Sequence, residues 1–451
     1  MENYSIKNVI VSPTRIIVSG FIFLIIGGSL FLCLPICTKD GYIPFIDAFF
    51  TATSASCVTG LSVYDTYSKF TFIGQLAILI MIQTGGLGLV SFTTFFSILY
   101  QKKLGFKALR IACFASGVDD VSTIKNLYKS TFKVVFFCES LGAIALFPAF
   151  IYKFGFLNGI WISLFTSISA FCNAGFDLCG LISPSSSLSL FYSNIWVNSI
   201  ITALIICGGL GFVVWNEILL YKTSHKFSFN SKIVFLSTVI LIFFGTCVFF
   251  ISEYTNPLTI KNMTLTQKLL CSFFQSITCR TAGFSTINQT NLNSFSKIFS
   301  CILMFIGCSP TGTGGGIKVT TLAVLIITIS SVIRGKTQSV FLGHKIQPYN
   351  IYKTITVIFI SMLIVVVNFS ILYFTTTASN IDCLYESFSA FSTTGLSVGV
   401  TEKMSFISKL STIITMFLGR VGPMSIAISL YKNYNDFYST EIYPEGKIIV
   451  G

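Results

Sequence analysis

Long apolar runs separated by short polar segments dominate the chain. Stretches such as 16–36, 234–251 and 355–374 are long enough to cross a bilayer core, which takes about 20 helical residues. They are apolar on every face, whereas the strands of a membrane barrel alternate apolar and polar positions over about 10 residues. The pattern therefore predicts an all-α integral membrane protein. The first run is longer than the core of a signal peptide, so we interpret it as a span.

A short glycine-bearing segment recurs four times. The segments centre on Gly60, Gly175, Gly283 and Gly395, at intervals of 115, 108 and 112 residues. Each follows a stretch rich in Phe, Ser, Thr and Ala that is too short to cross a bilayer as a helix: 45–57, 162–172, 265–279 and 381–392. We therefore predict four repeats of helix, pore helix and helix, with eight transmembrane helices. The units are repeat A at 1–110, repeat B at 111–225, repeat C at 226–343, and repeat D with the C-terminus at 344–451.

Irregular backbone at mid-membrane needs protein or water around its carbonyl groups. Four half-crossing segments are therefore expected to meet around one pseudo-fourfold axis, where carbonyl oxygens can replace the hydration shell of an ion. A single Thr-Gly or Ala-Gly would indicate only a helix-packing spot, but four in register favour a pore. The predicted ion-binding residues are Val58, Thr59 and Gly60; Asn173, Ala174 and Gly175; Thr281, Ala282 and Gly283; and Thr393, Thr394 and Gly395.

Composition and charge fit a membrane chain. Hydrophobic residues make up 53% of the sequence and charged residues only 10%, against about 25% charged residues in soluble domains. The net charge of +13 would otherwise favour nucleic acid, but the basic residues follow the positive-inside rule if both termini are cytoplasmic. We therefore expect a multi-pass plasma-membrane protein that contacts lipid and binds no nucleic acid. The 14 cysteines have no metal-site spacing and are interpreted as core residues.

Two further strings complete a family pattern. The run GCSPTGTGGGIKVTT at 307–321 and GRVGP at 419–423, with the four glycine motifs, resemble the Trk/Ktr/HKT superfamily of potassium transporters, and within it the KtrB-like membrane subunits of Ktr systems. Trk-type members carry extra amino-terminal helices, which this chain lacks room for. Sodium-selective HKT members have Ser in place of the first filter glycine, whereas this chain has Gly60. The resemblance thus implies a potassium uptake protein rather than an enzyme.

The resemblance also implies partners and ions. It implies K⁺ at the filter carbonyls as the transported ion and no covalently bound cofactor. It further implies a homodimer and a cytosolic, nucleotide-binding regulatory subunit, KtrA-like, and it leaves open Na⁺ as an activating or coupling ion. The basic segments 102–133 and 222–232 are candidate docking surfaces for that subunit, with topology signals and lipid headgroup contact as the alternative.

The glycine-rich run is predicted to form a gate. Its spacing does not match a P-loop, and it interrupts an apolar stretch at 298–332 that is too long for one span. In the family the matching loop is an intramembrane gate, and the matching arginine faces the pore. The implied gate residues are Gly312, Thr313, Gly314, Gly315, Gly316, Lys318 and Arg420. Snorkelling or a structural ion pair is the alternative for Arg420, and Lys318 either holds the loop or reaches the inner interface.

Other polar residues leave alternatives open. Glu139 is a candidate ligand of a coupling ion, or a carboxylate hydrogen-bonded inside the bundle. We expect Arg280 to stabilise the back of the filter, and Asp65 and Asp177 either to enrich cations at its mouth or to form a solvated rim.

Rival functions fit less well. A coupled secondary transporter of Na⁺ or ammonium would need an intramembrane His or acid relay, and neither His lies in a predicted span. A membrane enzyme would need a catalytic motif such as HExxH, which the sequence does not contain.

Overall fold

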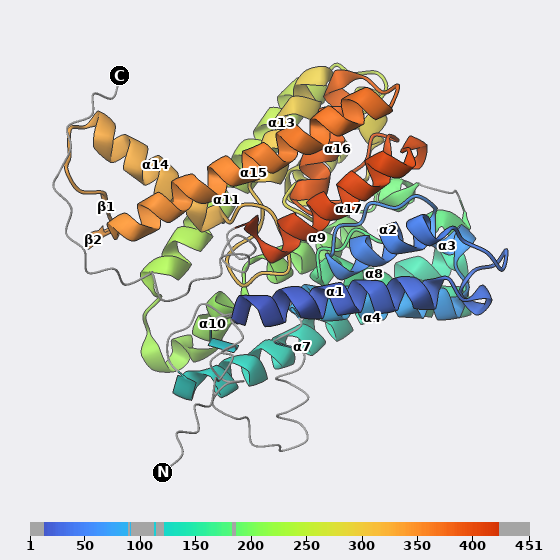
Figure 1. Ribbon diagram of the computed structural model, residues 1–451, viewed down its shortest axis with the longest axis horizontal. Coiled ribbons are helices and arrows are strands. Elements are labelled where there is room, and N and C mark those ends of the chain that lie inside the picture. Colours follow the sequence, from blue (N-terminus) through green and yellow to red (C-terminus); the bar gives the residue numbers. More distant parts are fainter. Residues whose placement is uncertain (1–12, 89–90, 92–111, 114–120, 183–185, 424–451) are drawn as a thin grey trace, which may run out of the picture.

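The computed structural model describes residues 13–88, 91, 112–113, 121–182 and 186–423. This part of the chain is helical apart from one two-stranded hairpin, as the apolar runs predict (Figure 1). The first half contains α1 (Pro13–Leu32), α2 (Phe45–Ser56), α3 (Thr66–Lys69), α4 (Phe72–Leu87), α7 (Val121–Phe154), α8 (Phe156–Phe171), α9 (Ile195–Gly209) and α10 (Phe212–Ser224). The second half contains α11 (Phe229–Glu253), α12 (Leu265–Thr278), α13 (Ser294–Phe305), α14 (Val319–Ile333), β1 (Val340–Phe341), β2 (His344–Lys345), α15 (Pro348–Thr375), α16 (Asn380–Phe391) and α17 (Phe406–Val421).

Short 3-10 helices lie in the connections between these elements. They are η1 (Pro35–Cys37), η2 (Cys179–Leu181), η3 (Ser187–Phe191), η4 (Gln289–Asn291) and η5 (Thr401–Lys403).

Four of the described helices are long and apolar enough to cross a membrane: α1, α7, α11 and α15. Each of them carries large apolar side chains that face outward. Phe23, Ile144, Phe243 and Phe359 are all at least 70% exposed. Side chains of this kind need an apolar surrounding, so these helices form the surface that faces lipid.

The second helix of each predicted repeat is shorter than a full span. Helices α4 and α17 have 16 residues, α13 has 12, and α9 and α10 meet at a 95° bend. Three of these helices end or bend at a glycine with positive φ: Gly88, Gly211 and Gly422. By length and composition, the described residues therefore contain four candidate spans, or five if the bent pair is one span. The eight transmembrane helices stay a prediction.

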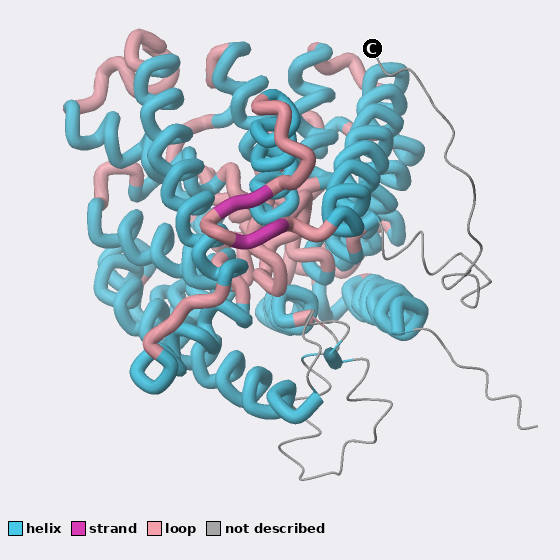
Figure 2. Tube along the Cα trace, turned by 90° about the vertical axis from the view of Figure 1, so that its left-hand side faces the viewer, coloured by secondary structure: helices cyan, strands magenta, loops and turns pink. Residues whose placement is uncertain are grey.

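The four short helices that precede the glycine motifs pack in a closed order. Each one contacts the long helix before it, in the pairs α1 with α2, α7 with α8, α11 with α12, and α15 with α16. Each also contacts the helix that follows a neighbouring motif, in the pairs α4 with α8, α9 with α12, α13 with α16, and α17 with α2. Helices therefore surround a centre that is filled by loop segments (Figure 2).

Two buried ion pairs join neighbours in this order. Lys409 of α17 lies 2.5 Å from Asp47 of α2, and Lys297 of α13 lies 2.7 Å from Asp382 of α16. At the matching contact between α4 and α8, the Trp161 indole N–H donates to the Gln75 side-chain oxygen at 2.8 Å. Oppositely charged partners that are both removed from water can lie inside a membrane protein at an acceptable cost.

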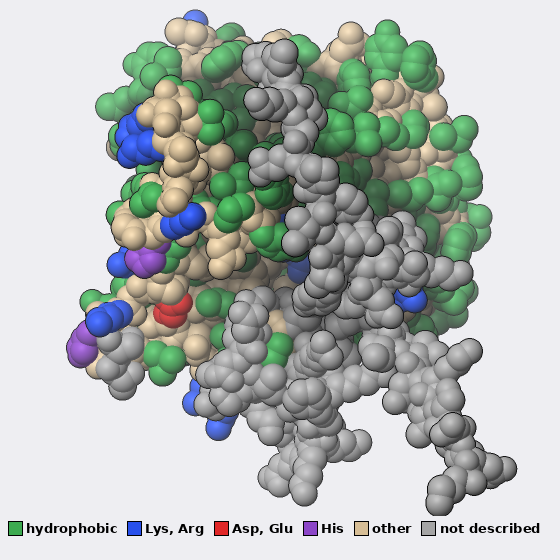
Figure 3. Space-filling view, turned by 60° about the vertical axis from the view of Figure 1, so that its left-hand side comes forward, with side chains coloured by type: hydrophobic (Ala, Val, Ile, Leu, Met, Phe, Trp, Pro, Cys, Tyr) green, Lys and Arg blue, Asp and Glu red, His purple; other side chains and the backbone are tan. Residues whose placement is uncertain are grey.

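Basic side chains gather at one end of the molecule. The β1–β2 hairpin connects α14 to α15, and Lys, Arg and His side chains cluster on the left of the face in Figure 3. The exposed members near the hairpin and near the junction of α10 and α11 are Lys222, Lys226, Lys232, Arg334, Lys336, Lys345 and Lys353. This distribution fits an end that faces the cytoplasm.

Replacing Lys409 by Met should lower the free energy of unfolding by about 3–5 kcal/mol, because it leaves the Asp47 carboxylate buried without its cation. Denaturant unfolding of the purified protein in detergent measures this loss. Lys69→Met is the matched control, because its partner Asp40 has a side chain that is 72% exposed and the pair contributes about 1 kcal/mol or less. Equal losses in the two variants would contradict the assignment of Lys409 as a structural ion-pair partner.

Candidate functional site

The four glycine motifs, residues 58–60, 173–175, 281–283 and 393–395, share an unusual backbone. In each motif, a non-glycine residue with positive φ lies two positions before a glycine that also has positive φ. The non-glycine residues are Val58, Asn173, Thr281 and Thr393, with φ between 52° and 67°. A β-branched residue such as Val58 rarely adopts this conformation, so the surrounding structure must impose it. The same geometry in all four motifs marks them as equivalent.

The motifs meet in a closed ring. A methyl group added to any of the four glycines would lie less than 3 Å from the carbonyl oxygen that precedes the glycine of the next motif. On Gly60 the methyl group would lie 2.4 Å from the Ala174 oxygen, and on Gly175 it would lie 2.9 Å from the Ala282 oxygen. On Gly283 it would lie 2.4 Å from the Thr394 oxygen, and on Gly395 it would lie 2.2 Å from the Thr59 oxygen. Only glycine fits at these positions, and four backbone carbonyls lie close together as a result.

Side chains of the short helices hold the motifs from behind. The Gly60 N–H donates to the Ser54 hydroxyl at 3.0 Å, and the Thr278 hydroxyl donates to the Phe284 carbonyl at 2.5 Å. In the fourth unit, the buried Glu386 carboxylate accepts hydrogen bonds from the Ser397 hydroxyl and the Thr401 N–H. These contacts fix the backbone on the outer side of the ring.

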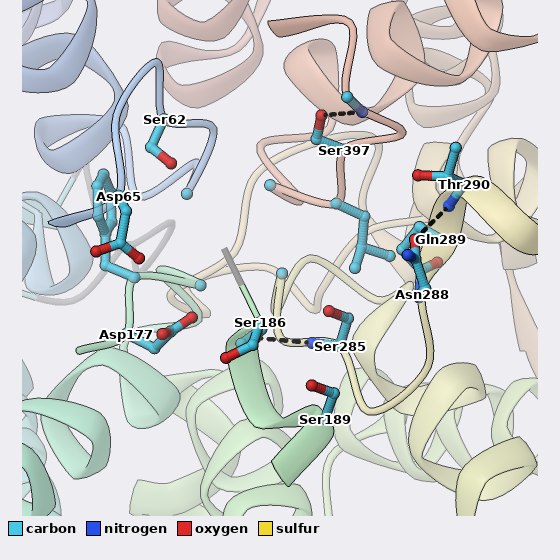
Figure 4. A pocket seen from close by; sticks show the side chains of 18 of the residues that line it. Ser62, Asp65, Asp177, Ser186, Ser189, Ser285, Asn288, Gln289, Thr290 and Ser397 are labelled. Carbon is cyan, nitrogen blue, oxygen red and sulfur yellow. Dashed lines mark hydrogen bonds between the residues drawn. The ribbon is translucent and has the colours of Figure 1, made fainter. Parts of the chain in front are cut away.

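A polar cavity of about 350 Å³ lies against the four glycines. Figure 4 shows Asp65 and Asp177 on one side of this cavity and Ser397 and Gln289 on the other. Burial, and to a lesser degree the nearby charge of Asp65, raises the pKa of Asp177 to about 6, although the Cys179 N–H donates a hydrogen bond to its carboxylate. The cavity is therefore lined by oxygen atoms and by three carboxyl groups, those of Asp65, Asp177 and Glu402.

The glycine-rich run lies against the motifs from another direction. We call Gly312–Gly316 the glycine loop. The Gly315 N–H donates to the Thr393 hydroxyl at 3.0 Å, and the Thr313 hydroxyl donates to the Phe171 carbonyl at 3.2 Å. A methyl group on Gly314 would lie 1.9 Å from the Thr281 hydroxyl oxygen. Glycines thus allow this loop to pack directly on two of the motifs.

Two cations hold the glycine loop. The Lys318 ammonium donates to the Gly314 carbonyl at 2.8 Å. The Arg420 guanidinium donates to the carbonyls of Thr313 and Gly85, and to that of Gly86 at 3.1 Å. Neither cation takes part in the ion pairs found between described residues. Arg420 therefore connects the loop to the end of α4, and the Lys318 side chain is hydrogen-bonded to the loop backbone.

The sequence contains a related repeat that our sequence analysis missed. Gly85-Gly86-Leu87-Gly88 and Gly208-Gly209-Leu210-Gly211 correspond to Gly419-Arg420-Val421-Gly422. A methyl group on Gly85, Gly208 or Gly419 would lie within 1.9 Å of the carbonyl oxygen of Ser56, Phe171 or Phe391, respectively. Arg420 thus takes the position that glycine occupies in two other units. The twice-repeated Gly-Gly-Leu-Gly string was the signal that could have revealed this.

Two further candidates do not line the cavity. Glu139 of α7 is buried and accepts hydrogen bonds from the Gln83 amide at 3.0 and 3.1 Å. Within the described residues, no group of His, Cys, Asp and Glu side chains is arranged to hold a metal ion. Arg280 is buried behind the third motif, where it donates to the Thr238 hydroxyl at 3.3 Å.

Comparison with known proteins identifies the family. The family model for TrkH, described as a cation transport protein, matches residues 13–439. The chain belongs to this family. It is 37% identical over 445 residues to the potassium/sodium uptake protein NtpJ of Enterococcus hirae, which covers 98% of this chain and 97% of that protein. It is 34% identical to the Ktr system potassium uptake protein B of Bacillus subtilis, with coverage of 99% and 98%.

A similar protein from a third organism and a solved structure agree with this assignment. The Ktr system potassium uptake protein B of Vibrio alginolyticus is 32% identical, with coverage of 97% of this chain and 94% of that protein. The crystal structure of the potassium transporter TrkH from Vibrio parahaemolyticus has the same fold, with a TM-score of 0.75 at 17% identity, over 96% of this chain and 87% of that one. The expected family and the all-α membrane fold are confirmed, and the family is one of membrane cation transporters, not enzymes.

Proposed function

We propose that this chain takes up K⁺ across the plasma membrane, and that the ion passes through the ring of four glycine motifs. The observation that carries the proposal is the closed order of contacts in which each glycine meets the carbonyl that precedes the next one. Backbone carbonyls grouped in this way can replace the water around K⁺. Relatives at 32–37% identity are named as potassium or potassium/sodium uptake proteins, which supports the same ion.

Electrostatics support inward movement of a cation. Asp65 and Asp177 border the cavity in front of the ring and attract cations to it. The membrane potential then drives each charge inward with about 2.3 kcal/mol per 100 mV. Uptake through this path therefore needs no hydrolytic chemistry in the chain, which we place in the membrane with both termini in the cytoplasm and in four repeats divided at 110, 225 and 343.

The glycine loop acts in this proposal as the gate. It packs on Thr281 and Thr393, and Lys318 and Arg420 hold it there through carbonyl contacts. A loop rich in glycine can leave this position when those contacts break. Arg420 also places a positive charge beside the path, where it opposes cations while the loop is closed.

The proposed assembly has two further parts. Two copies of the chain form a homodimer, and a cytosolic nucleotide-binding subunit of the KtrA type regulates it. The exposed basic residues near the hairpin and in the 222–232 segment lie at the end that we place in the cytoplasm, and they offer a docking surface for this subunit. The other candidate segment, 102–133, lies largely outside the described residues.

Sodium is the second candidate ion. The relative NtpJ is named for uptake of both potassium and sodium, which favours Na⁺ either as a second transported ion or as an activating or coupling ion. Measuring K⁺ uptake with and without external Na⁺, and Na⁺ uptake on its own, separates these roles.

Gly283→Ser should reduce the preference for K⁺ over Na⁺ at least tenfold, because the added side chain enters the ring, where even a methyl group would lie only 2.4 Å from the Thr394 oxygen. Competitive ion uptake in cells that lack their own potassium uptake systems measures this preference. Gly27→Ser is the matched control, since a methyl group there meets no atom within 4 Å. Unchanged ion preference in Gly283→Ser would argue strongly against the ring as the filter.

Arg420→Gln should increase K⁺ flux on the order of tenfold, because it removes both an anchor of the glycine loop and a positive charge beside the path. Deleting Gly312–Gly316 should increase flux in the same direction. Lys261→Gln, at an exposed position after α11, removes a charge without touching the loop or the proposed docking surface and should leave flux unchanged. Normal flux in both loop variants, at equal amounts of protein in the membrane, would refute the gate.

External acidification should weaken K⁺ uptake around pH 6. The Asp177 carboxyl has a pKa of about 6, so its negative charge is present above that pH and disappears as the pH falls through it. We expect the KM for K⁺ to rise as the external pH falls from 7 to about 5. Asp177→Asn should abolish this step, whereas Glu402→Gln, on the exposed rim, should retain it. A pH profile that is the same in Asp177→Asn and in the unmodified chain would contradict this role.

A further inference from the structure

Arg280 places a buried positive charge directly behind the third glycine motif. It follows the end of α12 and immediately precedes Thr281, the first residue of that motif. Only 6% of the residue is exposed. A guanidinium stays protonated in proteins, so this charge is permanent.

The guanidinium of Arg280 is poorly compensated. Its Nη2 donates to the Thr238 hydroxyl of α11 at 3.3 Å, and its buried Nε has no hydrogen-bond partner. The ion pairs found between described residues do not include it. Burying a charge without a counter-ion costs several kcal/mol, so packing alone does not account for an arginine at this position.

The surroundings lower this cost without cancelling the charge. Arg280 lies past the C-terminal end of α12, and α9 also ends near it, at Gly209; helix C-termini carry partial negative charge. A cavity of about 10 Å³ lies between Arg280, Thr238 and Cys308. It has room for about one water molecule, which can accept a hydrogen bond from Nε. A hydrated counter-ion does not fit there.

We propose that Arg280 is a fixed positive charge that limits how tightly K⁺ binds in the ring, and that it thereby sets both the affinity and the rate of uptake. This inference rests on the proposed function of the ring. Conduction requires a site that is favourable enough for the ion to enter and weak enough for it to leave. A like charge held behind the carbonyls, in a medium of low dielectric constant, raises the energy of the bound cation.

The position of Arg280 separates this role from gating. Arg420 and Lys318 donate to carbonyls of the glycine loop, whereas the side chain of Arg280 donates to Thr238 of α11. The Cys308 thiol donates to the main-chain carbonyl of Arg280 at 3.4 Å. Removing the charge of Arg280 should therefore change the affinity for K⁺ rather than release the gate.

The test compares Arg280→Gln with Arg280→Lys. The purified full chain is placed in lipid vesicles with an inside-negative potential, and initial rates of Rb⁺ uptake, with Rb⁺ as the K⁺ analogue, are measured against concentration. Arg280→Gln should lower KM on the order of tenfold and also lower the maximal rate, because the ion leaves more slowly. Arg280→Lys keeps the charge and should retain both values. Lys268→Gln, which removes a buried cation near the other end of α12, should leave KM unchanged.

A second variant keeps the test decisive if Arg280→Gln does not fold. Thr238→Asp places a carboxylate where the hydroxyl now accepts from Arg280, so it neutralises the charge while the arginine remains. It should lower KM in the same direction. The proposal is wrong if every neutralising variant that reaches the membrane has a KM within about twofold of that of the unmodified chain. It is also wrong if Arg280→Lys changes KM as much as Arg280→Gln. Absence of uptake by the unmodified chain would instead overturn the proposed function itself.

Discussion

The contact between each motif glycine and the carbonyl oxygen before the next glycine constrains the whole centre of the protein. Each motif also holds a non-glycine residue at positive φ, which costs of order 1–3 kcal/mol per residue. The local sequence therefore does not stabilise the motif conformation. Hydroxyl groups of the short helices, such as those of Ser169 and Thr278, and the neighbouring motifs must supply that stability. Because each motif is completed by the next, the four units depend on one another.

The charged groups are distributed unevenly around this ring. Asp65 and Asp177 border the cavity on one side, and Arg420 and Lys318 hold the glycine loop against the ring. Asp47 and Asp382 lie in the first turns of α2 and α16, far from the ring, and each is neutralised by a lysine. On the proposed path, a cation would meet negative charge first, neutral carbonyls next, and positive charge beside the loop. Occupancy of the ring by a cation would then depend on attraction by the carboxylates and carbonyls and on repulsion by the two cations.

Much of this site could be predicted from the sequence, because its signals are local. The predicted short segments 45–57, 265–279 and 381–392 match α2, α12 and α16 to within a residue at each end. The predicted start of the second segment, at residue 162, was wrong: α8 begins at Phe156, directly after Gly155, whose φ of 80° separates it from α7. The number of spans stays a prediction, because only four described helices, or five with the bent pair, are long and apolar enough to cross a membrane. Apolar length does not reveal that Gly88, Gly211 and Gly422 adopt a positive φ that ends or bends a helix.

Other features could not be predicted because they join distant positions. The partners Lys409 and Asp47 lie 362 residues apart. Nothing near Lys409 in the sequence distinguishes it from a residue that sets topology. The acceptors of Arg420 are backbone carbonyls, which every residue has, so no residue type marks them. The local sequence pattern therefore predicts where the ring forms, but it does not predict the contacts that hold the glycine loop against it.

The four units are unequal, and this inequality would allow a single charge to hold the proposed gate. The loop comes from the third unit, Arg420 from the fourth, and its acceptors Gly85 and Gly86 from the first. If the matching positions Gly86 and Gly209 also carried arginine, several guanidiniums would lie around one axis. Like charges about 4 Å apart repel by about 4 kcal/mol per pair at an effective dielectric constant of 20. Glycine at those positions both avoids this repulsion and leaves the carbonyls free to accept. The asymmetry is thus a physical requirement of a gate that a single arginine holds.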